Sequence, residues 1–170
     1  KVMSEKYDIT VRAIIGPEPE DAKHVRILNR YVTLVPHDDN TSQVPDYHIE
    51  YEADPRHAEL IVRQLGLEKG KSVTTPGVKR KASEVFAETP VLSKQMATQY
   101  RSIVMRAAYL RVDRVDVQYS TKELARHMQE PTEADWLQLK RLGRYLLHRP
   151  RVVQKFVHQR VPEAITVYGD

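Results

Sequence analysis

The sequence has no cysteine, and its 170 residues include only 2 Phe, 1 Trp and 6 Gly. The missing cysteine excludes disulfide scaffolds, cysteine-based zinc sites, iron–sulfur clusters and thiol nucleophiles. No apolar run approaches the roughly 20 residues that span a bilayer, and the first residues lack the apolar stretch of a secretory signal. We therefore expect an intracellular chain, cytoplasmic or nuclear, that is not secreted and has no membrane partner.

Charge is distributed unevenly along the chain. The total is 27 Lys and Arg against 23 Asp and Glu, a net charge of +4. Up to residue 66 there are 8 basic and 12 acidic residues, whereas from residue 136 onward there are 7 and 2. No acidic residue occurs between Trp136 and Pro162. This asymmetry points to a polyanionic partner, and the alternative is a solvated helix face that only keeps the domain soluble.

The first part of the chain has the alternation of β-strands. Strands are expected over residues 7–15, 25–35 and 47–51, and they predict a small antiparallel sheet. Asp54 and Pro55 then begin a predicted helix that Gly66 ends. We expect residues 1–66 to form one α+β segment.

The second part has the spacing of helices. Residues 67–92 show no periodicity, which predicts a flexible linker. Apolar residues then recur at helical spacing from residue 93 to 110, and Asp116 is expected to cap a second helix. Thr132 and Asp135 resemble a capping box that opens a third.

These signals predict a compact three-helix unit over residues 93–150 and a short β-hairpin within residues 151–170. The hairpin strands are expected at Val153 to Val157 and Ala164 to Tyr168. The fold class is therefore expected to be α+β.

Exposed cations are predicted on the third helix. Lys140, Arg141 and Arg144 lie away from its apolar stripe, because residues three and four apart share a helix face. Arg149 follows at the end of the helix, and Lys79, Arg80 and Lys81 form a basic triplet in the linker. All seven residues are candidate contacts to a polyanion.

The sequence predicts no complete catalytic or metal site. The seven histidines form no i,i+4 pair and have no acidic partners at ligand spacing, and no Gly-rich phosphate loop occurs. Capping and helix-dipole compensation explain Asp113 and Asp116. Asp170 stands at the expected end of the last strand, a place where carboxylates often hold divalent cations, but one carboxylate binds magnesium poorly. We expect no cofactor in this chain.

Several groups of residues in the second half carry a family resemblance. They are Tyr100-Arg101-Ser102-Ile103-Val104, Tyr109-Leu110, Asp113-Arg114-Val115-Asp116-Val117, Pro131-Thr132, Trp136, Lys140-Arg141 and Arg144-Tyr145-Leu146. In order and spacing they resemble the reverse transcriptases of copia-type retrotransposons, between the polymerase and its RNase H domain. Met105 and Val115 depart from that pattern, since the family usually carries glycine and proline there.

The resemblance extends weakly to both sides. Tyr51, Leu60-Ile61 and the run from Lys71 to Pro76 are similar to the preceding thumb region. Ile165 to Asp170 is similar to the first strand of that family's RNase H, which ends on its first catalytic aspartate.

The resemblance implies a fragment of a Pol polyprotein, made of a thumb-like segment (1–66), a linker (67–92), a connection segment (93–150) and the first RNase H strands (151–170). Such a fragment would hold an RNA–DNA hybrid or DNA duplex primer-template beside adjacent polymerase and RNase H domains. The family's tyrosine-x-aspartate-aspartate metal motif is absent, so the polymerase centre is expected to be incomplete. The RNase H centre is also expected to be incomplete, because its other carboxylates would follow Asp170. The resemblance therefore assigns magnesium to the parent enzyme. Asp170 would be the first RNase H carboxylate.

Two other functions stay open at this stage. The helices could form a structural connector that packs on neighbouring protein domains and binds no nucleic acid. An enzyme would instead need Asp170 close to Asp113 or Asp116 to hold magnesium for nuclease chemistry.

Overall fold

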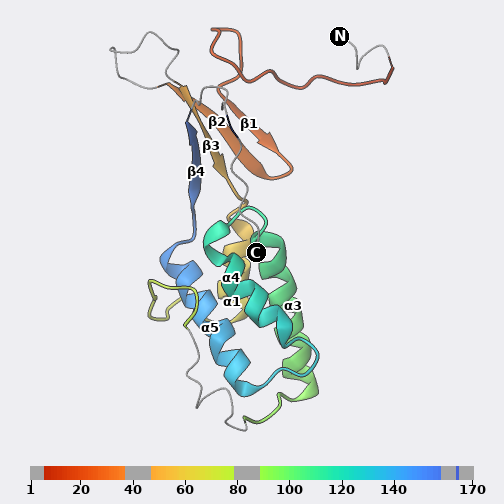
Figure 1. Ribbon diagram of the computed structural model, residues 1–170, viewed down its shortest axis with the longest axis vertical. Coiled ribbons are helices and arrows are strands. Elements are labelled where there is room, and N and C mark those ends of the chain that lie inside the picture. Colours follow the sequence, from red (N-terminus) through yellow and green to blue (C-terminus); the bar gives the residue numbers. More distant parts are fainter. Residues whose placement is uncertain (1–5, 37–46, 79–88, 158–163, 165–170) are drawn as a thin grey trace. The chain divides into compact units, whose positions relative to one another are not determined.

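The computed structural model describes residues 6–36, 47–78, 89–157 and 164. These residues form two compact units, one within residues 1–52 and 153–170 and the other within residues 53–152. The first is a sheet and the second is helical (Figure 1). The predicted α+β class is confirmed.

The sheet unit has four antiparallel strands among the described residues. They are β1 (His24–Ile27), β2 (Arg30–Pro36), β3 (Tyr47–Glu52) and β4 (Val153–Val157), paired in the order β1-β2-β3-β4. Leu34, Ile49 and Phe156 are paired in one row across the sheet. The next row pairs Thr33, Glu50 and Lys155. Because neighbouring rows point to opposite faces, the sheet has one largely apolar and one largely polar face.

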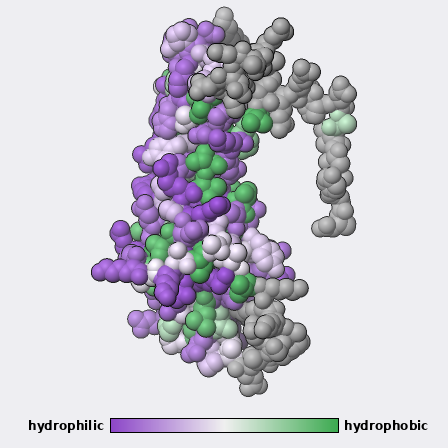
Figure 2. All heavy atoms as spheres, turned by 90° about the vertical axis from the view of Figure 1, so that its left-hand side faces the viewer, coloured by the Kyte–Doolittle hydropathy of each residue, from purple (hydrophilic) through white to green (hydrophobic). Residues whose placement is uncertain are grey.

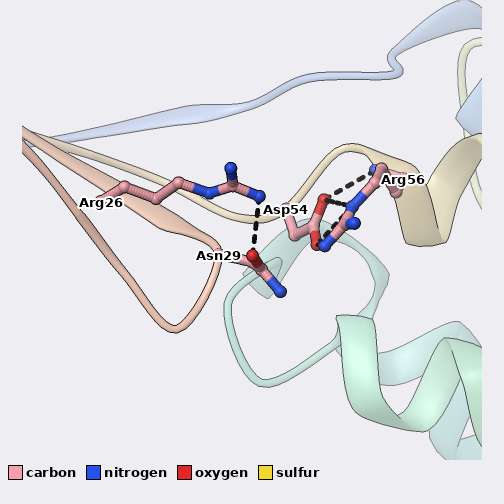
Figure 3. A network of polar contacts seen from close by, with 4 residues as sticks. All are labelled: Arg26, Asn29, Asp54 and Arg56. Carbon is pink, nitrogen blue, oxygen red and sulfur yellow. Dashed lines mark hydrogen bonds and ion pairs between the residues drawn. The ribbon is translucent and has the colours of Figure 1, made fainter.

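A tight turn divides what the alternation predicts as a single strand over residues 25–35. Leu28 and Asn29 have φ angles of 48° and 66°. Two left-handed residues in succession form the type of turn that joins two-residue hairpins. Arg26 Nη2 donates to Asn29 Oδ1 at 2.7 Å beside this turn (Figure 3). The sequence does not indicate this turn, because leucine seldom takes a positive φ.

One further strand prediction differs from the structure, and another strand has a partner that its sequence does not indicate. Residues 7–14 form no strand, and Tyr7, Ile9, Val11 and Ile14 are exposed. Alternation alone does not make a strand, because its backbone also needs a neighbour. The strand β4, which is expected in a C-terminal hairpin, pairs with β3. The hairpin's second strand, apart from Ala164, lies outside the described residues.

The helical unit contains α1 (Arg56–Gln64), α3 (Lys94–Leu110), the 3₁₀ turn η1 (Val115–Val117), α4 (Gln118–Arg126) and α5 (Glu133–His148). The helix α1 packs on α3 and α5, and α4 packs on α3 (Figure 1). The predicted three-helix unit is present, and α1 joins it. No described helix is long and apolar enough to cross a membrane.

Local signals account for both ends of α1 and for the start of α3. Asp54 Oδ1 accepts from the Arg56 backbone N–H at 3.0 Å, and its carboxylate pairs with the Arg56 guanidinium (Figure 3). Gly66, with a φ of 64°, lies just past the C-cap of α1 and takes the left-handed conformation that commonly follows a helix. Ser93 Oγ accepts from the Met96 N–H at the start of α3.

Candidate nucleic-acid interface

The helix α5 carries the predicted cationic face. Thr132 and Asp135 form the expected capping box, with the Thr132 N–H donating to Asp135 Oδ2 at 2.9 Å and the Asp135 N–H donating to Thr132 Oγ1 at 3.4 Å. Leu139, Leu142 and Leu146 are buried on the inner side of the helix. Their burial fixes the rotation of α5 about its axis and thereby the positions of its cations.

The structure describes four of the seven predicted cations. Arg144 and Arg149 are exposed, whereas Lys140 and Arg141 are half-buried. None of the four forms an ion pair with an acidic residue that the structure describes. Lys79, Arg80, Lys81 and Asp170 lie outside the described residues. The charge on α5 is therefore available to an external anion.

The segment after α1 runs along this helix. Arg141 Nη2 donates to Thr75 Oγ1 at 2.7 Å, and the Val73 N–H donates to the carbonyl oxygen of Arg144 at 3.4 Å. The Nε atom of Arg141 is buried and has no hydrogen-bond partner within the described structure. The Arg141 side chain is therefore partly engaged within the fold, whereas the side chains of Lys140 and Arg144 are more available to a ligand.

Gly143 lets α5 pack closely against the leucine side chains that follow α1. A Cβ atom on Gly143 would lie 2.6 Å from Leu65 Cδ1 and 2.8 Å from Leu67 Cδ1. Glycine in the middle of a helix costs about 1 kcal/mol relative to alanine. Sequence reasoning passed over Gly143, although a mid-helix glycine is itself a signal of close packing.

A buried ion pair anchors the C-terminal end of α5. Arg114, whose side chain is 2% exposed, pairs with Asp116 at 2.7 Å. The Arg114 guanidinium also donates to the carbonyl oxygens of Arg149 at 3.0 Å and Pro150 at 3.1 Å. Tyr145 on α5 donates its hydroxyl to Asp116 Oδ2 at 2.8 Å. This network fixes the position of the exposed Arg149 at the end of α5.

The prediction that Asp116 caps a helix is wrong. The helix α4 has no side-chain cap, and both Asp116 oxygens accept hydrogen bonds from Arg114. The sequence signal was the pair of aspartates on either side of Arg114, which also fits an ion pair. A carboxylate held in this way is a poor candidate for binding magnesium.

The protonation of this network follows from its surroundings. Burial by itself raises the pKa of Asp116, but the hydrogen bonds from Arg114 and Tyr145 outweigh it and lower that pKa. Burial, followed by the nearby Asp116 carboxylate, raises the pKa of the Tyr145 hydroxyl. Both effects keep Asp116 charged and Tyr145 protonated at neutral pH.

A histidine on α1 is also partly buried. The His57 ring lies 4.7 Å from the Tyr109 ring between centroids, and its Nδ1 atom is buried with no hydrogen-bond partner in the described structure. Burial lowers the pKa of His57, and Asp54 opposes this shift. The described residues contain no group of three or more His, Asp or Glu able to hold a metal ion.

These features define an α+β protein whose principal candidate site is a cationic helix face. Its sequence is similar to curated proteins of Arabidopsis thaliana. The chain is 35% identical over 92 residues to an uncharacterized mitochondrial protein, AtMg00810. It is 42% identical over 53 residues to the retrovirus-related Pol polyprotein from transposon RE2, and 35% identical over 90 residues to that from transposon RE1.

The chain is homologous to retrotransposon Pol polyproteins, and the resemblance predicted from its sequence is confirmed. These alignments cover 54%, 31% and 53% of this chain. They span 36% of the mitochondrial protein but only 4% and 6% of the polyproteins from RE2 and RE1. No family model matches the chain. No solved structure matches it either.

Proposed function

We propose that this chain is a thumb and connection segment of a retrotransposon Pol polyprotein, and that it holds primer-template nucleic acid through the cations on and just after α5. The observation that carries the proposal is that Lys140, Arg141, Arg144 and Arg149 form no ion pair with any described acidic residue. The relationship to Pol polyproteins supplies the biological setting.

The spacing of these cations suits a phosphate backbone. Residues 140 to 148 of α5 extend along roughly 12 Å at 1.5 Å per residue, and Arg149 follows directly. Phosphates on one strand of a duplex follow each other about every 3.4 Å along the axis, so this length corresponds to roughly four phosphates. Guanidinium groups bind phosphate oxygens by paired hydrogen bonds without reading the bases. The ligand would thus be recognised as an RNA–DNA hybrid or DNA duplex, independently of its sequence.

Catalysis belongs to the parent protein in this proposal. The segment would contact adjacent polymerase and RNase H domains, and magnesium would serve the parent's active sites. Asp170 would supply the first RNase H carboxylate, and Lys79, Arg80 and Lys81 a second set of phosphate contacts. The proposed setting is intracellular, in the cytoplasm or nucleus. By itself the segment would bind nucleic acid without turning it over.

The test is binding of the purified chain to a fluorescent RNA–DNA hybrid across a salt series. The triple variant Lys140→Ala, Arg141→Ala, Arg144→Ala is expected to bind more weakly, with the salt slope reduced by about 2 to 3, because each phosphate contact contributes about 0.7 to 0.9. The matched control removes three exposed cations elsewhere, in Arg63→Ala, Lys69→Ala, Lys94→Ala. An equal change in the control, or an unchanged slope in the α5 variant, would refute the proposal.

A structural connector is the second candidate, and the exposed apolar residues of the sheet favour it. Ile27, Ile49 and Phe156 are exposed. Such residues suit a contact with another protein surface. If the chain fails to bind the hybrid even at low salt, the connector function gains support and the α5 cations need an acidic protein partner.

A further inference from the structure

An open groove lies where α3 ends and α4 begins. Its volume is about 660 Å³, within the range of small-molecule sites. The lining residues belong to the helical unit and are Arg111, Val112, Val115, Gln118, Tyr119 and Lys122. These six residues form the α3–α4 groove.

The packing of α4 directs the groove residues outward. Ser120, Thr121 and Leu124 are buried on the inner side of this helix. Tyr119 and Lys122 are three positions apart, so they share the opposite side. The Tyr119 side chain is 72% exposed, which leaves most of its ring accessible. Tyrosine is enriched at binding interfaces, because its ring is apolar and its hydroxyl is polar.

The charge of the groove has a single sign. Arg111 and Lys122 line it, and no acidic residue does. Neither cation forms an ion pair with a residue in the described parts of the chain. Gln118 Nε2 donates to the carbonyl oxygen of Arg111 at 3.2 Å, which ties the start of α4 to the end of α3. The groove therefore combines an anion-attracting rim with an aromatic surface.

We infer that the α3–α4 groove binds an unpaired stretch of single-stranded nucleic acid, with a base stacked on Tyr119 and the flanking phosphates on Arg111 and Lys122. Exposed aromatic rings beside cations recognise single strands because every base has a stacking face and every linkage has a charge. Val112 and Val115 supply apolar walls beside the base. A paired duplex buries its bases and offers only phosphates to this groove.

The inference goes beyond the duplex-holding function proposed for α5 and stands independently of it. It assigns a second ligand, unpaired nucleotides, to a second set of residues. The two assignments fail separately, because one is tested with a duplex and α5 variants and the other with a single strand and groove variants.

The experiment measures binding of a short fluorescent oligothymidylate to the purified chain. Tyr119→Ala is expected to weaken binding roughly 5- to 150-fold, since a stacked base contributes that much, whereas Tyr119→Phe retains most of the affinity. The double variant Arg111→Ala, Lys122→Ala is expected to lower the salt slope by about 0.7 per cation. Tyr7→Ala, which removes another exposed tyrosine outside the groove, is the matched control.

The outcomes separate the sources of binding. Loss of oligothymidylate binding in Tyr119→Ala with unchanged hybrid binding would support the groove. Equal affinity of wild type and Tyr119→Ala, or equal loss in Tyr7→Ala, would overturn it. Failure of the wild-type chain to bind the oligonucleotide at low salt would also overturn it, whatever the hybrid experiment shows. Circular dichroism of each variant checks that the helical unit is folded.

Discussion

The two units of the chain bury their apolar residues to very different extents. Every described residue of the buried hydrophobic core lies between Ala53 and Leu146, in the helical unit. In the sheet unit, the residues described as buried are His48 and Glu52, whereas Phe156 is 54% exposed. Apolar side chains are also visible among hydrophilic ones at the surface in Figure 2.

The two units are therefore expected to be stabilised by different interactions. Helices that enclose a core gain free energy from apolar area removed from water, at about 25 cal/mol per Å². A sheet with an uncovered apolar face depends on its backbone ladder and cross-strand pairs, which contribute less. The helical unit is therefore expected to be the stable part, and it is also the part that carries the α5 cations and the α3–α4 groove.

The largest expected effect comes from the buried ion pair of the helical unit. Asp116→Ala leaves the Arg114 guanidinium buried without its carboxylate, which should lower the free energy of unfolding by about 3 to 5 kcal/mol. The measurement is urea denaturation followed by the fluorescence of Trp136, the chain's single tryptophan, which packs against the core. Glu123→Ala is the control, since its pair with Arg126 is exposed and should contribute about 1 kcal/mol or less. A similar small loss for both variants would contradict this prediction.

A core substitution in each unit tests the comparison itself. Ile103 is 0% exposed, so Ile103→Ala should lower the free energy of unfolding by about 2 to 5 kcal/mol. Phe156→Ala should lower it by about 1 kcal/mol or less. Hydrogen exchange read separately over α3 and β3 measures the effect within each unit. Comparable losses would show that the sheet's apolar face is covered in solution.

The smallest expected effect is a pH dependence through His57. Burial lowers its folded-state pKa below 6.5, so the unfolded chain takes up the proton first as the pH falls. This contribution to stability is complete above about pH 6.5 and is lost as the pH falls through the folded-state pKa. His57→Phe keeps a ring against Tyr109 and should flatten the unfolding free energy between pH 7 and pH 5, as measured by urea titration at each pH. A steeper dependence in the variant would show that another group dominates.

Much of the helical unit follows from residues that lie close together in the sequence. The Thr132 and Asp135 capping box, the Ser93 cap and the positive-φ Gly66 act over three or four positions, so their patterns predict helix ends directly. The same holds for the cations of α5, because the buried leucines dictate which side of the helix they occupy. The roles proposed for these cations stay predictions.

Partners distant in the sequence could not be predicted in this way. Strand β4 pairs with β3 across about a hundred residues, and no local pattern specifies which edge a strand will join. Residues 7–14 alternate like a strand yet form none. The Leu28 and Asn29 turn uses a backbone conformation that leucine rarely adopts, so the hairpin is supported by its ladder more than by its turn residues.

The sequence alone therefore determined the α+β class, the ends of the principal helices, the cationic character of the C-terminal part and the relationship to retrotransposon Pol polyproteins. Tertiary structure decided that Arg114, Asp116 and Tyr145 meet, and that an exposed Tyr119 lines the same groove as Arg111 and Lys122. Caps and helix faces depend on neighbours within one or two turns. Ion pairs and grooves depend on how whole helices pack, which is settled only when the core excludes water.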